Sequence, residues 1–296
     1  MDFSDVTLQL IGSTIRMSIP MVFAAMAGVI SERSGVINIA LEGFVLIGAF
    51  FAAVGSLTMG SPWAGLGLAC LSGLVLAAAY ALFVIDLRAD QIVAGTAINM
   101  LAFGTAPLLC KMFFNSASSS PAVELVGRFQ VAPLWIGFAL VLGVWAWLRW
   151  TPGGLWLQFA GEHPEALECG GIRVRRIRWL AVMASGCIAA AGGATLSIFL
   201  SSSFSRGMSG GRGFMALAAM IFGRWKPIPA ALACILFGFT EAVQMQLQGV
   251  NFPGTSQQVP VQLIQIIPYL ATVVVLASFV GRSYAPKSLG KAYQRS

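Results

Sequence analysis

The sequence contains few charged residues. They make up 10% of its 296 residues, whereas soluble proteins carry roughly 25%. Because 57% of the residues are hydrophobic, a soluble fold of this length would leave many apolar side chains facing water. A lipid bilayer removes this difficulty, because it is an apolar solvent for such side chains. Only the backbone N–H and C=O groups then need hydrogen-bond partners within the protein. The composition therefore predicts a polytopic membrane protein and excludes a soluble fold.

Motifs that carry chemistry are also missing. The five cysteines form no CxxC pair, and the single histidine, His163, has no Ser or Cys nucleophile at a catalytic spacing. The chain has no GxxxxGK[ST] phosphate loop, so it does not bind ATP by that device. It also has no HExxH, no GxSxG and no paired intramembrane aspartates. These absences predict no metal site, no disulfide framework and no cofactor, and they indicate that the chain is not an enzyme.

Long apolar runs are present instead, and crossing the hydrocarbon core needs about 20 residues. On that scale the chain holds nine segments, at 8–30, 36–55, 62–85, 91–113, 132–150, 179–200, 211–224, 227–248 and 260–281. Two of them are irregular, because 36–55 contains Asn38, Glu42, Gly43 and Gly48 and the short segment 211–224 follows a Ser/Gly-rich stretch. Interrupted hydrophobic segments are typical of broken helices that line a transport path. The predicted fold is an all-α transmembrane helical bundle of about nine spans, two of them broken or short.

Basic residues predict the orientation of the bundle. The 18 Lys and Arg exceed the 11 Asp and Glu, and in a soluble chain this excess would suggest nucleic acid. Here they gather in the loop 149–178, the turn 224–226 and the C-terminal tail, where they act as orientation signals. Nine alternating spans place all three on one side, predicted to be the cytoplasm, with the N-terminus outside. The loop 151–178 has about 28 residues, fewer than the roughly 50 of an independent domain, so residues 1–296 are predicted to form a single transmembrane domain.

Polar residues within the apolar segments are candidates for the lining of a solute path. Asn38 and Glu42 have the i, i+4 spacing that places two side chains on one helix face, and intramembrane acids usually face the bundle interior or a water-filled cavity. A structural anchor at the start of a broken helix explains this pair equally well.

Other polar residues lie in later segments. Glu241, Gln244 and Gln248 share one face of segment 227–248, where amides and a carboxylate suit neutral, hydroxyl-bearing solutes. Ordinary polarity near the outer membrane surface is the alternative for this face. Asn99 is a weaker candidate that also fits an interhelical hydrogen bond.

A short helix is predicted in the cytoplasmic loop. Pro164 suits the first turn of a helix, Glu165 and Glu168 complement its N-terminal half, and Gly170 and the following glycine end it. Together with Glu162 and Ala166, these residues form a surface helix on which a soluble partner can dock. A solvated connector between two spans is the alternative.

Three stretches together resemble the permeases of bacterial ABC importers for simple sugars, nucleosides and branched-chain amino acids. They are GVINIALEGFVLIGAF at 35–50, GEHPEALECGGIRVRRIR at 161–178 and GRGFMALAAMIFGRWKP at 211–227. The resemblance runs from about residue 8 to 281 and is strongest to the nucleoside-type permeases that work beside basic-membrane-protein-like receptors. Branched-chain amino acid permeases typically have His-Gly where this chain has Glu42-Gly43.

The resemblance implies a function and a set of partners. It places Glu165, Ala166 and Gly170 where such permeases have the EAA-type coupling helix that docks on an ATPase subunit, although Leu167-Glu168 departs from that motif. It also implies an ATP-binding subunit, a second and longer permease chain, an extracytoplasmic solute-binding protein and the bacterial inner membrane. The predicted function is the translocation of a small neutral solute, with a nucleoside favoured. A simple-sugar permease and an ion-coupled secondary transporter are the alternatives.

Overall fold

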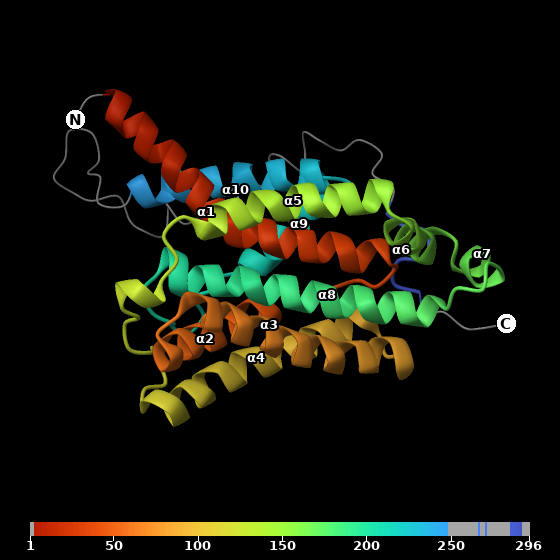
Figure 1. Cartoon of the computed structure of the whole chain (residues 1–296), viewed down its shortest axis with the longest axis horizontal. Helices are drawn as coiled ribbons and strands as arrows, with labels where there is room; N and C mark the ends of the chain where they lie inside the picture. The colour runs from red at the N-terminus through yellow and green to blue at the C-terminus, as the bar shows by residue number, and fades with distance from the viewer. Residues whose placement is uncertain (1–2, 248–265, 267–269, 271–284, 292–296) are drawn as a thin grey trace.

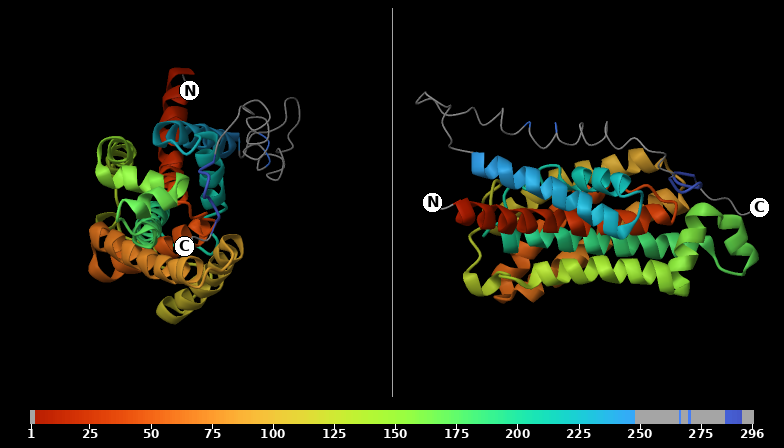
Figure 2. Two further views of the ribbon diagram at one scale, coloured as in Figure 1. Left: turned by 90° about the vertical axis from the view of Figure 1, so that its right-hand side faces the viewer. Right: turned by 90° about the horizontal axis from the view of Figure 1, so that it is seen from above.

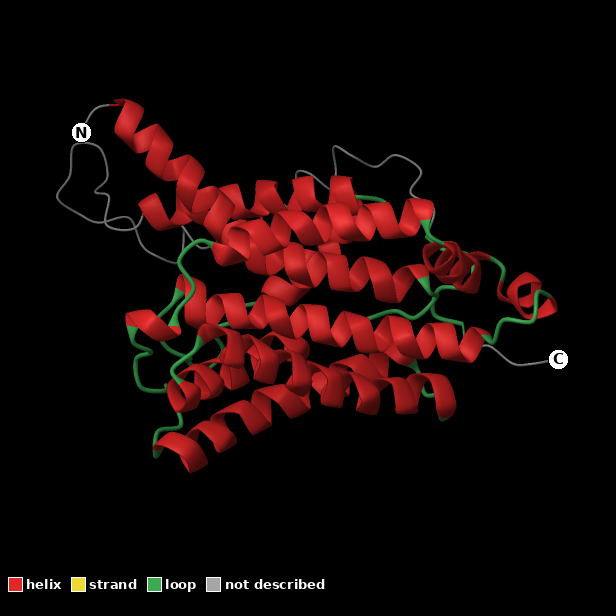
Figure 3. Cartoon of the chain, in the orientation of Figure 1, coloured by secondary structure: helices red, strands yellow, loops and turns green. Residues whose placement is uncertain are grey.

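A computed structural model of the chain describes residues 3–247, 266, 270 and 285–291 (Figure 1). In this part of the chain every regular element is helical (Figure 3), which confirms the predicted all-α class. The long helices are α1 (Phe3–Arg33), α2 (Leu41–Met59), α3 (Pro62–Ala81), α4 (Gln91–Phe114), α5 (Ala132–Trp150), α8 (Val174–Thr195) and α10 (Pro227–Leu247). The shorter ones are η1 (Leu82–Asp86), η2 (Leu125–Gly127), α6 (Pro152–Glu162), α7 (Pro164–Cys169), η3 (Leu196–Leu200) and α9 (Arg212–Phe222).

The predicted spans correspond to these helices. Seven helices of the described residues are long and apolar enough to cross a membrane, and α9, with 11 residues, covers only about 16 Å at 1.5 Å per residue. The predicted segment 260–281 lies outside the described residues, apart from positions 266 and 270. The expectation of two irregular helices is confirmed, because α9 is short and α2 begins only at Leu41, well inside segment 36–55.

Helices α1, α2 and α8 form the centre of the bundle, whereas α4 and α5 lie at its periphery (Figures 1 and 2). Small residues let the central helices approach closely, as is common between membrane helices. Gly73 of α3 faces Gly186 of α8, and the backbone of each occupies the space that a Cβ on the other would need. Gly193 of α8 meets the backbone of Val45 in α2 in the same way.

An irregular segment, 201–211, separates η3 from α9. Helix α9 then packs against α10. Backbone groups at membrane depth must be satisfied internally, and the loop 115–131 supplies several of the partners. The backbone N–H groups of Ser120, Val123 and Phe129 donate to the carbonyls of Phe204, Ser202 and Ile198 at 3.0, 2.6 and 2.9 Å. The loop therefore holds the irregular segment against the bundle.

The basic segments come together at one end of the molecule, which also carries α6 and α7 (Figure 1). Tail residue Ser288 donates its backbone N–H to Gly161 at the end of α6, at 2.8 Å. The turn 223–226 joins the same end, since Arg33 in the last turn of α1 donates to the Trp225 carbonyl at 2.7 Å. The loop, the turn and the tail therefore share one side, as the sequence predicted.

Candidate functional site

A polar cluster forms where α2 and α9 begin. Glu42, in the first turn of α2, is 1% exposed. Its two carboxylate oxygens accept hydrogen bonds from the backbone N–H groups of Gly211, at 2.9 Å, and Gly213, at 2.7 Å. The first N–H groups of a helix have no partner within the helix and carry its positive partial charge. Glu42 therefore caps α9 from another helix.

Two glycines make this contact possible. Gly211 has a φ of +83°, a left-handed conformation that side chains rarely adopt. A Cβ added at Gly213 would lie 2.6 Å from the Cα of Glu42, which is closer than carbon atoms approach. The start of α9 can reach Glu42 only because both positions lack a side chain.

Asn99 of α4 holds the start of α2. Its Nδ2 donates to the Ile39 carbonyl at 2.9 Å, and its Oδ1 accepts from the Gly43 N–H at 2.8 Å. The side chain is 5% exposed. Asn99 thus bonds across two helices, which was one of the two roles that its sequence context allowed.

The predicted helical spacing of Asn38 and Glu42 is wrong. Asn38 precedes α2 in an irregular segment, where the Gln91 side chain accepts from the Ile37 N–H at 2.8 Å and Tyr80 donates to the Ile37 carbonyl. Asn38 Nδ2 donates to Ser185 Oγ of α8 at 2.8 Å. These tertiary hydrogen bonds hold the segment out of the helix, so Asn38 and Glu42 bond to different helices.

Glu241 of α10 joins the same region through a residue that the sequence reading missed. Arg212, the first residue of α9, forms an ion pair with Glu241 at 3.2 Å, and the two side chains are 22% and 12% exposed. Gln244 lies one turn further along α10 and is partly buried, whereas Gln248 lies outside the described residues. Arg212 therefore links Glu241 to the turn that Glu42 caps.

Two further buried polar side chains also went unpredicted. Glu32, at the end of α1, accepts a hydrogen bond from Trp225 Nε1 at 2.6 Å and so ties α1 to the turn before α10. Arg178 of α8 is 3% exposed and donates to the carbonyls of Ser34 and Lys291 at 3.2 and 2.9 Å. Glu32 stands beside Ser31, Arg33 and Ser34 at the end of an apolar run, and Arg178 follows three exposed arginines, so neither could be told apart from a surface charge.

The predicted surface helix is present as α7, Pro164–Cys169, at the end of the bundle (Figure 1). It begins with Pro164 and is followed by Gly170 and Gly171, as expected. Leu167 is buried with Ala160 and Val174, and this apolar contact anchors the helix. The other positions of the predicted docking surface remain partly or fully exposed; they are Glu162, Glu165, Ala166, Glu168 and Gly170.

The structure thus separates two groups of residues. The polar cluster joins α2, α4, α9 and α10 inside the bundle, and α7 presents a small exposed surface at one end. No group of three or more His, Cys, Asp or Glu side chains in the described residues is arranged to hold a metal ion. A polar cluster inside the bundle, where helices are interrupted, is a feature of membrane transporters.

Comparisons with known proteins support this class. A metal-chelate-type ABC transporter solved in an inward-facing conformation has a similar fold, with a TM-score of 0.51 and 16% sequence identity over 94% of this chain and 90% of that one. The chain belongs to the family of branched-chain amino acid transport system permease components, whose model matches residues 10–279. The resemblance to ABC importer permeases is thereby confirmed, and the chain is a multi-pass membrane protein.

Individual relatives match along almost their whole length. The chain is 35% identical to the nucleoside ABC transporter permease protein NupC of Lactococcus lactis, over 98% of both proteins. It is 33% identical to the guanosine ABC transporter permease protein NupQ of Bacillus subtilis, over 99% of this chain and 98% of that protein.

Proposed function

We propose that the chain conducts a nucleoside across the bacterial inner membrane, as one permease subunit of an ATP-driven importer. The observation that carries this proposal is the match to NupC and NupQ over at least 98% of each, both of which are named for nucleoside or guanosine transport. Neutral amides and few acids inside the bundle support a neutral, hydroxyl-bearing solute.

The solute path is proposed to run past the polar cluster. Asn38 Oδ1 and Ser209 Oγ are completely buried and have no hydrogen-bond partner within the part of the chain that the structure describes. Buried polar atoms without partners are costly, and the hydroxyl and amide groups of a nucleoside would satisfy them. Glu42 and Asn99, whose oxygens already accept backbone hydrogen bonds, are proposed to shape this path.

Residues of α10 are proposed to complete the lining. Glu241 and Gln244 would face the solute, with Arg212 holding the Glu241 carboxylate in place; Gln248, beyond the described part of the chain, stays a sequence-based candidate. We expect Gln244→Ala to raise the KM for the nucleoside while leaving the maximal rate within about twofold, because it removes a contact made equally before and during translocation. An unchanged KM would remove Gln244 from the path.

The ATP-binding subunit is proposed to dock on α7. Leu167 packs the helix against Ala160 and Val174, whereas Glu165, Ala166 and Cys169 are exposed. Residues 1–296 are proposed to act as one transmembrane domain beside a second, longer permease chain, with an extracytoplasmic solute-binding protein delivering the nucleoside. The end that carries α7 would face the cytoplasm and the N-terminus the outside.

Cys169 offers a direct test of the docking surface. It is exposed, while the other four cysteines are buried or half-buried. We expect a maleimide to label Cys169 in the isolated chain and to be blocked when the ATP-binding subunit is present. Ser118→Cys combined with Cys169→Ser, which places the thiol at an exposed position of the loop after α4, is the matched control and should be labelled equally in both samples. Equal labelling of Cys169 would contradict docking at α7.

The same two cysteines test the orientation. A membrane-impermeant maleimide added to intact cells should label Ser118→Cys but reach Cys169 only after the membrane is opened. The reverse pattern would place α7 outside.

Uptake assays test the coupling and the solute. In proteoliposomes that hold the complete importer, Glu165→Ala combined with Gly170→Leu should leave ATP hydrolysis running but reduce guanosine uptake at least tenfold. Unlabelled nucleosides should compete with labelled guanosine, and glucose or ribose should not. If only the sugars compete, the transported solute is a sugar and not a nucleoside. That outcome would not affect the proposed docking of the ATP-binding subunit on α7.

A further inference from the structure

A basic hollow of about 430 Å³ lies at the end of the bundle that carries α6 and α7, where α1, α5, α6 and α10 meet. Its lining includes Arg33 from the end of α1, Arg149 from the end of α5, and Lys226 just before α10. No Asp or Glu belongs to that lining among the residues that the structure describes. The hollow therefore concentrates positive charge.

Within the described part of the chain, the three cations have no acidic partner in the hollow. The ion pairs that the structure shows among its described residues join Arg175 to Asp86 and Arg212 to Glu241, so Arg33, Arg149 and Lys226 are outside them. The Arg33 guanidinium donates hydrogen bonds to the Trp225 carbonyl at 2.7 Å and to Gln158 Oε1 at 2.6 Å. Glu162 carries a nearby negative charge but forms no ion pair with Arg33 among the described residues. An anion entering the hollow would meet unpaired positive charge.

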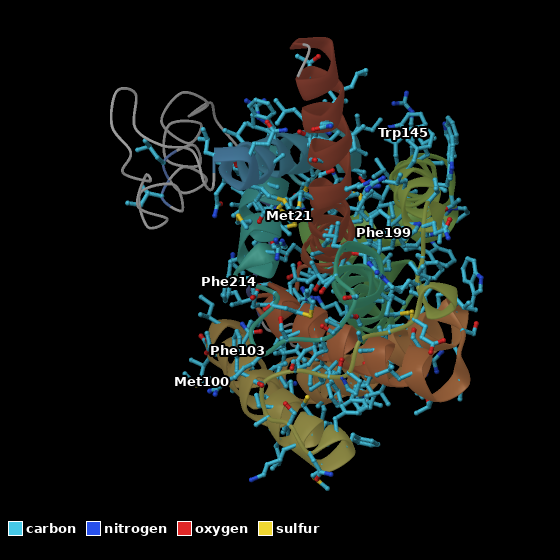
Figure 4. The ribbon with its side chains drawn as sticks, turned by 90° about the vertical axis from the view of Figure 1, so that its left-hand side faces the viewer. Met21, Met100, Phe103, Trp145, Phe199 and Phe214 are labelled. Carbon is cyan, nitrogen blue, oxygen red and sulfur yellow. The ribbon has the colours of Figure 1, made fainter. Side chains whose placement is uncertain are left out.

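Aromatic residues show the depth of the hollow in the membrane. Trp145 belongs to its lining, and Figure 4 shows it on the outer side of α5. Its ring lies 5.0 Å from that of Trp150, and Arg149 sits 5.8 Å from the Trp145 ring centre. Tryptophans gather at the level of the lipid headgroups. By this tendency we expect the cations to lie at the level of the headgroup phosphates.

An exposed apolar surface continues from the hollow into the bilayer. Ile228, Leu232 and Ile235 share one face of α10 and are 39, 62 and 41% exposed. Leu142, two turns before Arg149 on α5, is also exposed. A basic hollow above apolar helix faces matches the two halves of an anionic phospholipid, and basic pockets between membrane helices are known to bind such headgroups.

We propose that this hollow binds the phosphate headgroup of an anionic phospholipid, with its acyl chains along α5 and α10. The bound phosphate would bridge Arg149 and Lys226, next to the Arg33 guanidinium that holds the Trp225 carbonyl. The lipid would thus brace the turn that connects α9 to α10. The proposal needs only the membrane and holds whichever solute is carried.

The test is a lipid titration of the complete importer, followed by native mass spectrometry with cardiolipin, phosphatidylglycerol and phosphatidylcholine as probes. The wild type should retain the two anionic lipids and not phosphatidylcholine. Arg149→Gln with Lys226→Gln should bind cardiolipin about 25-fold more weakly, at about fivefold for each cation lost near a membrane surface.

The matched control is Arg176→Gln with Arg224→Gln, which removes the same charge from exposed positions outside the hollow. Its cardiolipin affinity should stay within twofold of the wild type. Thermal unfolding in a zwitterionic detergent checks that both double variants are folded.

Three results would overturn the proposal. An equal loss of cardiolipin affinity in both double variants would show that lipid binding depends on general surface charge and not on the hollow. Displacement of the lipid by millimolar inorganic phosphate, without preference among the phospholipids, would assign the hollow to a free anion. A wild-type importer that binds no anionic lipid would mean that a partner chain covers the hollow.

Discussion

Removal of the Glu42 carboxylate tests whether the contact between α2 and α9 is essential. Glu42→Ala leaves the N–H groups of Gly211 and Gly213 without their acceptor at a site that is 1% exposed. A buried donor without a partner costs about 1–3 kcal/mol, so two cost about 2–6 kcal/mol. The favourable charge at the helix start, up to about 2 kcal/mol in buried geometries, is lost as well. We expect the first turn of α9 to come loose and guanosine uptake to fall at least tenfold.

Graded variants separate the hydrogen bonds from the volume of the side chain. Glu42→Gln keeps the shape and one oxygen, but its amide N–H group faces a backbone N–H, so we expect an intermediate loss of uptake and of thermal stability. Glu124→Gln removes an acid from an exposed position of the loop before η2 and should behave as the wild type. The assays are uptake into proteoliposomes and the unfolding temperature of the purified importer. A Glu42→Ala importer with wild-type uptake and unfolding temperature would refute the reasoning.

The remaining predictions concern the other contacts of the cluster. Asn99→Ala should lower the free energy of unfolding by about 1–3 kcal/mol, because the Gly43 N–H loses its acceptor; an unchanged unfolding temperature would contradict this. Gly213→Ala should lower expression and uptake, since its Cβ would meet Glu42 at 2.6 Å, whereas Gly104→Ala, with open space around it, should not. Arg212→Gln and Glu241→Gln should each reduce uptake, and the double variant should lose less than the sum, since each single change leaves a half-buried charge without its partner. Additive losses would show that the two residues act independently.

Much of the bundle follows from the sequence, because apolar runs of about 20 residues have few alternatives to a membrane helix. The irregular starts of α2 and α9 were also visible, as polar and glycine-rich interruptions of such runs. The spacing argument failed at Asn38, where hydrogen bonds to Gln91 and Tyr80 hold the chain outside the helix. The spacing of residues along a short stretch carries no information about hydrogen-bond partners that are distant in the sequence.

The candidate site was only partly predictable for the same reason. Glu42 stood out as an acid in an apolar run, but its partners lie 169 and 171 residues away in the chain. Arg212 was passed over because an arginine at the start of a short apolar segment resembles an ordinary interfacial residue. Arg178 lies in the basic stretch and is nevertheless buried. The number of charges in a loop therefore does not predict which of them the fold buries.

The permease is proposed to conduct its solute only when another subunit hydrolyses ATP. The most direct measurement is guanosine uptake into proteoliposomes, with ATP and an ion gradient supplied separately and the ATP-binding subunit present or omitted. We predict uptake only when ATP and the ATP-binding subunit are both present. Gradient-driven uptake by the permease without that subunit would contradict the account.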